Sequence, residues 1–137
     1  MKGIKLIDKL TKEHKDVVAL LQEVQSKGID SKKGRKKLLA AEDLFIEHLQ
    51  REEDDLYPAL QAAAVDNVEL QDMLKEKYRD LQDVTLAAIA FFDKYSSTKK
   101  APEFEQDFKQ LFLVLTERIW VEQAEIFPIY VAAQKED

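Results

Sequence analysis

Residues that interrupt helices are scarce in this chain. Three glycines and three prolines occur among 137 residues, so few positions can form turns. Between them, apolar side chains recur at alternating spacings of three and four residues, which is the spacing of one face of an α-helix. No alternation with a period of two, which would indicate a half-buried β-strand, competes with this pattern. The sequence therefore predicts an all-α protein made of long helices.

Turn-forming residues divide the chain into four predicted helices. The joints are the region after Gly28, the stretch from Ala64 to Asn67, and the loop from Ser96 to Pro102. The predicted helices cover residues 4–27, 32–64, 67–97 and 102–134. Because their connections are short, they pack most simply as an antiparallel up-down-up-down four-helix bundle. We expect the whole chain to form this one domain.

The overall charge and the lack of cysteine exclude several kinds of function. A net charge of −6 does not suit a surface that binds nucleic acid through its phosphates. Without cysteine, the chain has no disulfides, thiolate metal sites or cysteine nucleophiles. The first residues are charged at short intervals, and no uncharged run approaches the length of a membrane span. We therefore expect a cytoplasmic protein with neither nucleic acid nor membrane as a partner.

Polar residues interrupt the apolar stripe of every predicted helix at a similar depth. Counting about 1.5 Å per residue from the nearest loop places the first such residue roughly 20–27 Å along each helix. These four residues are His14, His48, Tyr78 and Arg118. Glu52 and Glu122 follow two of them by four residues, and therefore lie on the same helix faces one turn further along. We expect all six side chains to converge inside the bundle.

Two buried carboxylates close together need positive charge nearby. A metal ion would supply it, because imidazole nitrogens and carboxylate oxygens form mixed sites that suit iron, manganese or zinc. The guanidinium of Arg118 would also supply it, by bridging Glu52 and Glu122 as a structural ion pair while the histidines form hydrogen bonds in the core. Spacing alone leaves both explanations open.

Two segments of the chain carry similar motifs in the same register. One runs from His48 through Glu52 to Tyr57-Pro58, and the other from Arg118 through Glu122 to Phe127-Pro128. Both resemble the H-x-x-x-E signature, followed by an aromatic residue and proline, of the hemerythrin-like HHE cation-binding family. The segments around His14 and Tyr78 resemble the remaining histidine segments of that family, so the resemblance covers about residues 4–133. The two prolines also predict paired kinks after the site.

The resemblance implies a four-helix bundle holding two non-haem irons. Members of this family bind oxygen, sense oxygen or redox state, or handle nitric oxide and iron. By position, the terminal ligands of one metal would be His14 and His48, and the two bridging carboxylates Glu52 and Glu122. The terminal ligands of the other metal are substituted in this chain, by Tyr78 and Arg118.

This pattern of substitution leads to a specific hypothesis. One iron remains, while the fixed charge of Arg118 replaces the second cation. Tyr78 either ligates the metal or donates a hydrogen bond to a carboxylate or a bound water. We therefore take Tyr78 and Arg118 as residues that contribute to binding the cofactor, beside the four metal ligands.

Two functions remain as alternatives. In the first, a degenerate mononuclear iron site serves in sensing or handling oxygen, nitric oxide, redox state or iron, with a small diatomic molecule as its ligand. In the second, the bundle is metal-free and acts as a regulatory or protein-interaction module. No nucleophile elbow, phosphate loop or catalytic triad spacing favours an enzyme. Apolar residues off the core stripe of the third and fourth predicted helices favour a homodimer through these helices.

Overall fold

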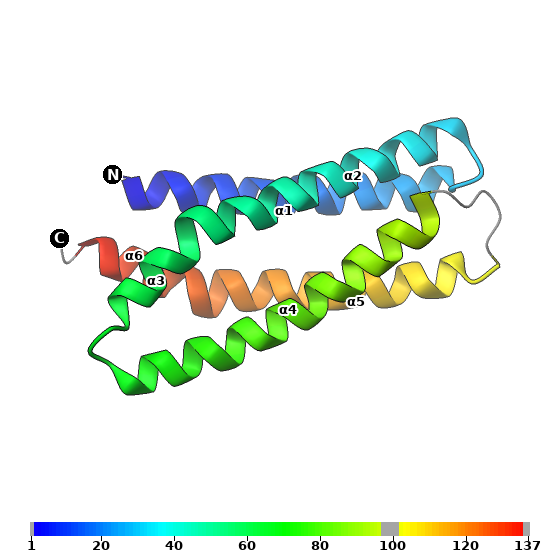
Figure 1. Ribbon diagram of the computed structural model, residues 1–137. Helices are drawn as coiled ribbons and strands as arrows, with labels where there is room; N and C mark the ends of the chain where they lie inside the picture. Colours follow the sequence, from blue (N-terminus) through cyan, green and yellow to red (C-terminus); the bar gives the residue numbers. More distant parts are fainter. Residues whose placement is uncertain (1, 97–101, 136–137) are drawn as a thin grey trace.

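The structure, a computed structural model, describes residues 2–96 and 102–135, and within these ranges the chain is helical and contains no strand. The helices form four long helical segments, called rods here, and consecutive rods run antiparallel (Figure 1). The second and fourth rods are each divided by a short π-helix. The elements are α1 (Lys2–Lys27), α2 (Lys32–Arg51), η1 (Glu52–Leu56), α3 (Tyr57–Ala63), α4 (Val68–Ser96), α5 (Phe104–Val121), η2 (Glu122–Ile126) and α6 (Phe127–Lys135). The predicted all-α four-helix bundle is confirmed.

The predicted rod boundaries agree closely with the structure. The second rod ends at Ala63 and the third begins at Val68, so each of these two boundaries differs from the prediction by one residue. The predicted last residue of the third helix, 97, lies outside the described residues. The fourth rod begins at Phe104, two residues after the proline that was expected to start it.

The turn between α1 and α2 depends on two glycines and a serine. Gly28 has a φ of +80°, a left-handed conformation that ends α1. Ser31 caps α2, because its Oγ accepts a hydrogen bond from the Gly34 amide at 3.0 Å and donates one to the Gly28 carbonyl oxygen, also at 3.0 Å. A Cβ at position 34 would lie 1.7 Å from that same oxygen. The turn therefore requires glycine at position 34.

Two apolar clusters fill the bundle on either side of a polar layer. The larger cluster, nearer the α1–α2 turn, contains Phe45, Phe91, Phe92, Phe104 and Phe108 among its buried residues. The smaller cluster contains Leu10, Leu56, Leu60, Leu81 and Ile126. The buried polar residues between them are Glu13, His14, His48, Glu52, Arg118 and Glu122, and each is at most 6% exposed. The polar layer is thus sealed on both sides by apolar packing.

The two π-helices begin at the two glutamates of the polar layer. The Tyr57 amide donates to the Glu52 carbonyl, and the Phe127 amide donates to the Glu122 carbonyl, so both turns are one residue wider than in an α-helix. Proline follows each turn, and its missing amide hydrogen prevents the α-helical pattern from continuing unbroken. The ribbon changes direction between α2 and α3 (Figure 1). The predicted kinks therefore take the form of paired π-helical turns.

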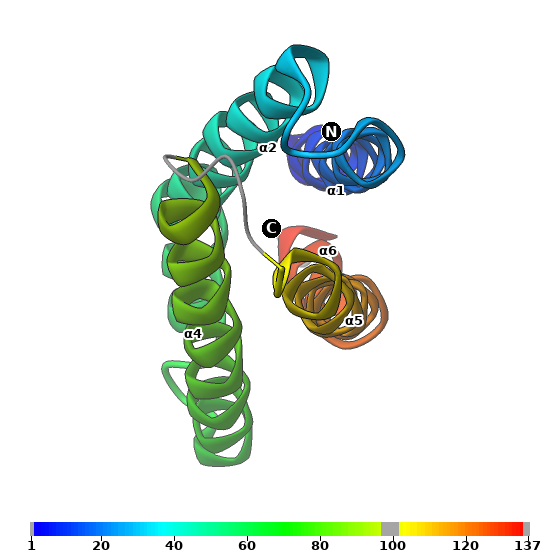
Figure 2. The ribbon, with the colours of Figure 1, turned by 90° about the vertical axis from the view of Figure 1, so that its right-hand side faces the viewer.

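Helix α4 is strongly inclined to α1 and α5. In Figure 2, α1 and α5 are seen nearly end on, whereas α4 is seen along much of its length. The first half of α4 therefore lies away from α1 and α5. No described helix combines the length and the apolar character that a membrane span requires.

Candidate metal centre

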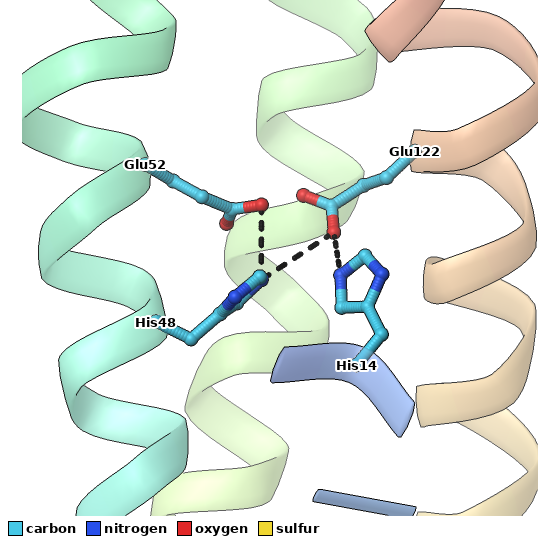
Figure 3. A group of neighbouring side chains, drawn as sticks. All are labelled: His14, His48, Glu52 and Glu122. Atoms are coloured by element: carbon cyan, nitrogen blue, oxygen red, sulfur yellow. Dashed lines mark hydrogen bonds and ion pairs between the residues drawn. The ribbon is translucent and has the colours of Figure 1, made fainter. Parts of the chain in front are cut away.

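Four of the predicted site residues meet in the polar layer. His14 comes from α1, His48 from α2, Glu52 from the first position of η1 and Glu122 from the first position of η2. Each offers one potential ligand atom, and these four atoms all lie within 4.8 Å of one another (Figure 3). The exposed fractions of the four residues are 6%, 3%, 0% and 0%. The sequence prediction that they converge agrees with this geometry.

The Nε2 atoms of both histidines face the carboxylates. His14 Nε2 lies 2.9 Å from Glu122 Oε1, and His48 Nε2 lies 3.1 Å from Glu52 Oε2. On this side, the buried atoms His48 Nε2 and Glu52 Oε2 have no hydrogen-bond partner among the described residues, although they lie 3.1 Å apart as an ion pair. Buried polar atoms without a partner cost free energy, and an imidazole nitrogen with carboxylate oxygens is a donor set that a divalent metal satisfies. The residues present therefore fit a bound metal ion.

The other ring nitrogen of each histidine is held by an oxygen atom. His14 Nδ1 lies 2.9 Å from Gln123 Oε1, and His48 Nδ1 lies 3.1 Å from Glu13 Oε1. An amide or carboxylate oxygen only accepts, so Nδ1 is the donor in both rings. In the neutral ring this leaves the lone pair on Nε2, which is the arrangement found in metal-bound histidines. Glu13 is itself held by Arg51, whose Nε donates to its two oxygens at 3.3 and 3.2 Å.

Arg118 lies on the opposite side of the carboxylates from the histidines' Nε2 atoms. Its Nη2 donates to Glu52 Oε1 at 3.1 Å and lies 3.7 Å from Glu122 Oε2. Its Nη1 donates to the Leu81 carbonyl at 3.3 Å and to the Thr85 hydroxyl. Each glutamate thus presents one oxygen to a histidine and the other to the guanidinium. The two carboxylates therefore lie between the histidines on one side and Arg118 on the other.

Tyr78 is the one predicted site residue that does not join this group. It makes no hydrogen bond with the site residues that the structure describes, and its ring packs edge-on against Tyr57 at 5.1 Å. The residues of α4 that reach Arg118 are Leu81 and Thr85, three and seven positions further along. The tilt of α4 explains why Leu81 and Thr85, rather than Tyr78, reach the site. The prediction counted residues from the turns and assumed that all four helices run parallel.

A different tyrosine, Tyr57, is close enough to the carboxylates for their charges to act on its pKa. The Tyr57 hydroxyl is buried and has no hydrogen-bond partner among the described residues. Burial, followed by the nearby charges of Glu52 and Glu122, raises the pKa of Tyr57, so the phenol stays protonated. Sequence reasoning did not single out Tyr57, although it belongs to the aromatic-proline part of the motif.

Phe127 occupies the equivalent position after η2. Its ring stacks on the His14 imidazole, with the ring centres 5.7 Å apart and the planes 6° apart. This contact restricts the orientation of the His14 ring. Sequence reasoning also missed the supporting roles of Glu13, Arg51 and Gln123, which no spacing rule identifies.

Burial and mutual contacts shift the pKa values of Glu52, Glu122 and His48 when no metal is bound. Burial and the neighbouring charge of Glu122 raise the pKa of Glu52 to about 8. Burial opposes ionisation of Glu122 as well, but its contacts with Glu52, His14, His48 and Arg118 hold the pKa of Glu122 well below its usual range. Burial would lower the pKa of His48, yet its contacts with both glutamates raise it to about 10. A bound cation would displace these protons.

The comparison with known families agrees with this geometry. Residues 5–130, nearly the whole chain, match the family model described as the hemerythrin HHE cation binding domain. Neither the curated proteins nor the solved structures that were compared gave a match. The family match covers all four residues of the candidate centre and both π-helices. The chain belongs to the hemerythrin HHE cation-binding domain family.

Proposed function

We propose that this chain binds a single iron ion through His14, His48, Glu52 and Glu122, and that Arg118 replaces the charge of a second cation. The observation that carries this proposal is the division of the carboxylate oxygens between the histidines and the guanidinium. An arginine already occupies the side where a second metal would share these carboxylates. We expect the cytoplasm as its compartment.

A small cavity beside the histidines supports a diatomic ligand. It measures about 20 Å³, and its lining includes His14, His48 and Glu122 together with apolar residues such as Phe45 and Leu115. This is enough space for one molecule of about the size of water. When bound, iron would supply a redox-active Lewis acid at the edge of this space. The apolar wall would exclude bulk water, and we propose sensing or handling of oxygen, nitric oxide or redox state as the role.

The stoichiometry of bound iron tests the proposal. The protein is purified without chelators or an affinity tag, reconstituted anaerobically with Fe(II), and analysed for iron per chain. We expect one iron per chain. A value of two would show that the arginine side also binds metal, and a value near zero would exclude the metal site.

The metal-free interaction module remains the second candidate. It is favoured by the Arg118 ion pairs, which already compensate part of the carboxylate charge. Large apolar side chains on the outside of α4 and α5 also favour it: Leu86, Leu113 and Trp120 are 66%, 68% and 63% exposed. A value near zero in the iron measurement would select this candidate.

Support of His48 by Glu13 leads to a prediction for metal affinity. We expect Glu13→Ala to weaken iron binding by about 10- to 100-fold, because the His48 ring loses the acceptor that orients its Nδ1. Glu47→Ala removes an exposed carboxylate from the same helix as His48 and serves as the matched control. Competition with a chelator of known affinity gives both constants. Equal affinities for the two variants would contradict a supporting role of Glu13.

The exposed apolar face of α5 leads to a prediction for oligomeric state. Leu113 and Trp120 are seven residues apart and therefore share one face of this helix. We expect light scattering to give twice the chain mass of 15.9 kDa, and we expect Leu113→Asp to restore the single-chain mass. Leu39→Asp places the same charge at a position on α2 that is 47% exposed and should leave the mass unchanged. A single-chain mass for the unaltered protein would exclude the dimer.

A further inference from the structure

A second and larger cavity lies between α3 and the first half of α4, outside the candidate metal centre. Its volume is about 320 Å³, within the range of small-molecule sites. Its floor includes Leu60, Leu81 and Ile126, which are at most 4% exposed. Its rim includes Val65, which is 69% exposed, and the exposed Lys75. The cavity therefore leads from the surface into apolar core.

The cavity follows from two features of the fold. The π-helix η1 changes the direction of the second rod just before α3, and α4 tilts away from α1 and α5 (Figures 1 and 2). The edge-on pair of Tyr57 and Tyr78 belongs to the cavity lining. The charges of Glu52 and Glu122 act on the pKa of Tyr57, but Tyr57 does not line the small cavity beside the histidines. The cavity and the metal centre are separate spaces.

The charges around the cavity differ from those of the chain as a whole. The chain has a net charge of −6, yet the lining contains two lysines and, among the described residues, no acidic side chain. Lys77 is paired with Glu125 at 2.7 Å. The ammonium group of Lys75 makes neither an ion pair nor a hydrogen bond with the rest of the described chain. One positive charge is thus available at the rim of an apolar cavity.

We propose that this cavity binds an amphipathic monocarboxylate, a small carboxylate with an apolar chain. The apolar chain packs against Leu60, Leu81 and Ile126, and the carboxylate pairs with Lys75. Apolar burial supplies the affinity, and the single free ammonium group selects an anion over a cation. The proposal does not depend on a bound metal, so it stands or fails independently of the iron site.

Calorimetric titration of the full chain with octanoate tests the proposal, with octylammonium as the probe of opposite charge. We expect saturable binding of one octanoate per chain and at least about tenfold weaker binding of octylammonium, since only the anion pairs with Lys75. Lys75→Gln should weaken octanoate binding by about tenfold. Lys109→Gln removes an exposed lysine on α5 that does not line the cavity, and should change nothing. Equal binding of both probes, or equal affinities of the two variants, would overturn the proposal.

Filling the cavity tests the location of the ligand. Leu74 is a half-buried lining residue, and Leu74→Trp should abolish octanoate binding while thermal melting followed by circular dichroism confirms the fold. A second measurement is independent of this variant. In the unaltered protein, octanoate should shift the methyl NMR signals of Leu60, Leu81 and Ile126 and leave those of Leu21 and Leu38, in the other apolar cluster, unchanged. Shifts confined to other residues, or no saturable binding, would show that the cavity takes no such ligand.

Discussion

Replacing Arg118 with leucine should lower the free energy of unfolding of the metal-free protein by about 3–5 kcal/mol, because it removes one partner of a buried ion pair. The guanidinium is 5% exposed and lies within 3.1 Å of Glu52 and 3.7 Å of Glu122. Without it, the two fully buried carboxylates keep, among the described residues, only the histidines as positive neighbours. The Thr85 hydroxyl also loses the donor that Arg118 provides, whereas the Leu81 carbonyl still accepts a hydrogen bond from Thr85. Urea denaturation of the apoprotein measures the loss.

Two comparisons make this result specific. Arg79→Leu removes an exposed arginine from α4 and should change the free energy of unfolding by no more than about 0.5 kcal/mol. The double variant Arg118→Leu with Glu52→Gln should recover part of the loss, because it removes one of the two acid groups that Arg118 had compensated. An Arg118→Leu protein as stable as its parent would show that the arginine does not act as a second cation.

The fold and the convergence of the site were predictable because they depend on regular quantities. The rise of an α-helix is constant, so similar counts of residues from the turns placed His14, His48 and Arg118 at nearly one level. The period of the apolar stripe fixed the inward face of each helix, and the i to i+4 spacing then brought Glu52 and Glu122 to the same interior. These predictions required only helices that are close to parallel.

The parts that could not be predicted depend on departures from regular helices. In an α-helix of about 100° per residue, Tyr57 would lie about 140° around the axis from Glu52, away from the site. The π-helix inserts a wider turn after Glu52, which brings Tyr57 closer to the helix face that carries Glu52, and the charges of Glu52 and Glu122 act on the pKa of Tyr57. Tyr78 lies outside the group because α4 is tilted. Counting residues along α4 from its turn gives the correct level only if α4 runs parallel to the other helices. The division of carboxylate oxygens between histidine and arginine is likewise a matter of side-chain conformation, which spacing does not specify.

The second large effect is expected at the α1–α2 turn, where Gly34→Ala should destabilise the protein by about 3 kcal/mol or more. Helix propensity alone predicts the opposite sign, because alanine favours a helix over glycine by about 1 kcal/mol. The Gly34 position is special because an added Cβ would lie 1.7 Å from the Gly28 carbonyl oxygen and 2.7 Å from its carbon. Both are backbone atoms, so relief requires the turn itself to move. That movement would also break the two hydrogen bonds of Ser31, at a further cost of about 1 kcal/mol.

The neighbouring glycine provides the matched control for this prediction. Gly28→Ala forces a left-handed φ of +80° on alanine, at a cost of about 1–2 kcal/mol, and its Cβ would lie 2.8 Å from the Asp30 side chain, which can rotate away. We therefore expect Gly34→Ala to lower the midpoint of urea unfolding more than Gly28→Ala does. The reverse order would mean that backbone conformation, rather than the contact of the two segments, determines this turn. Because α1 and α2 carry His14 and His48, a displaced turn should also weaken iron binding, whereas Gly28→Ala should leave it nearly unchanged.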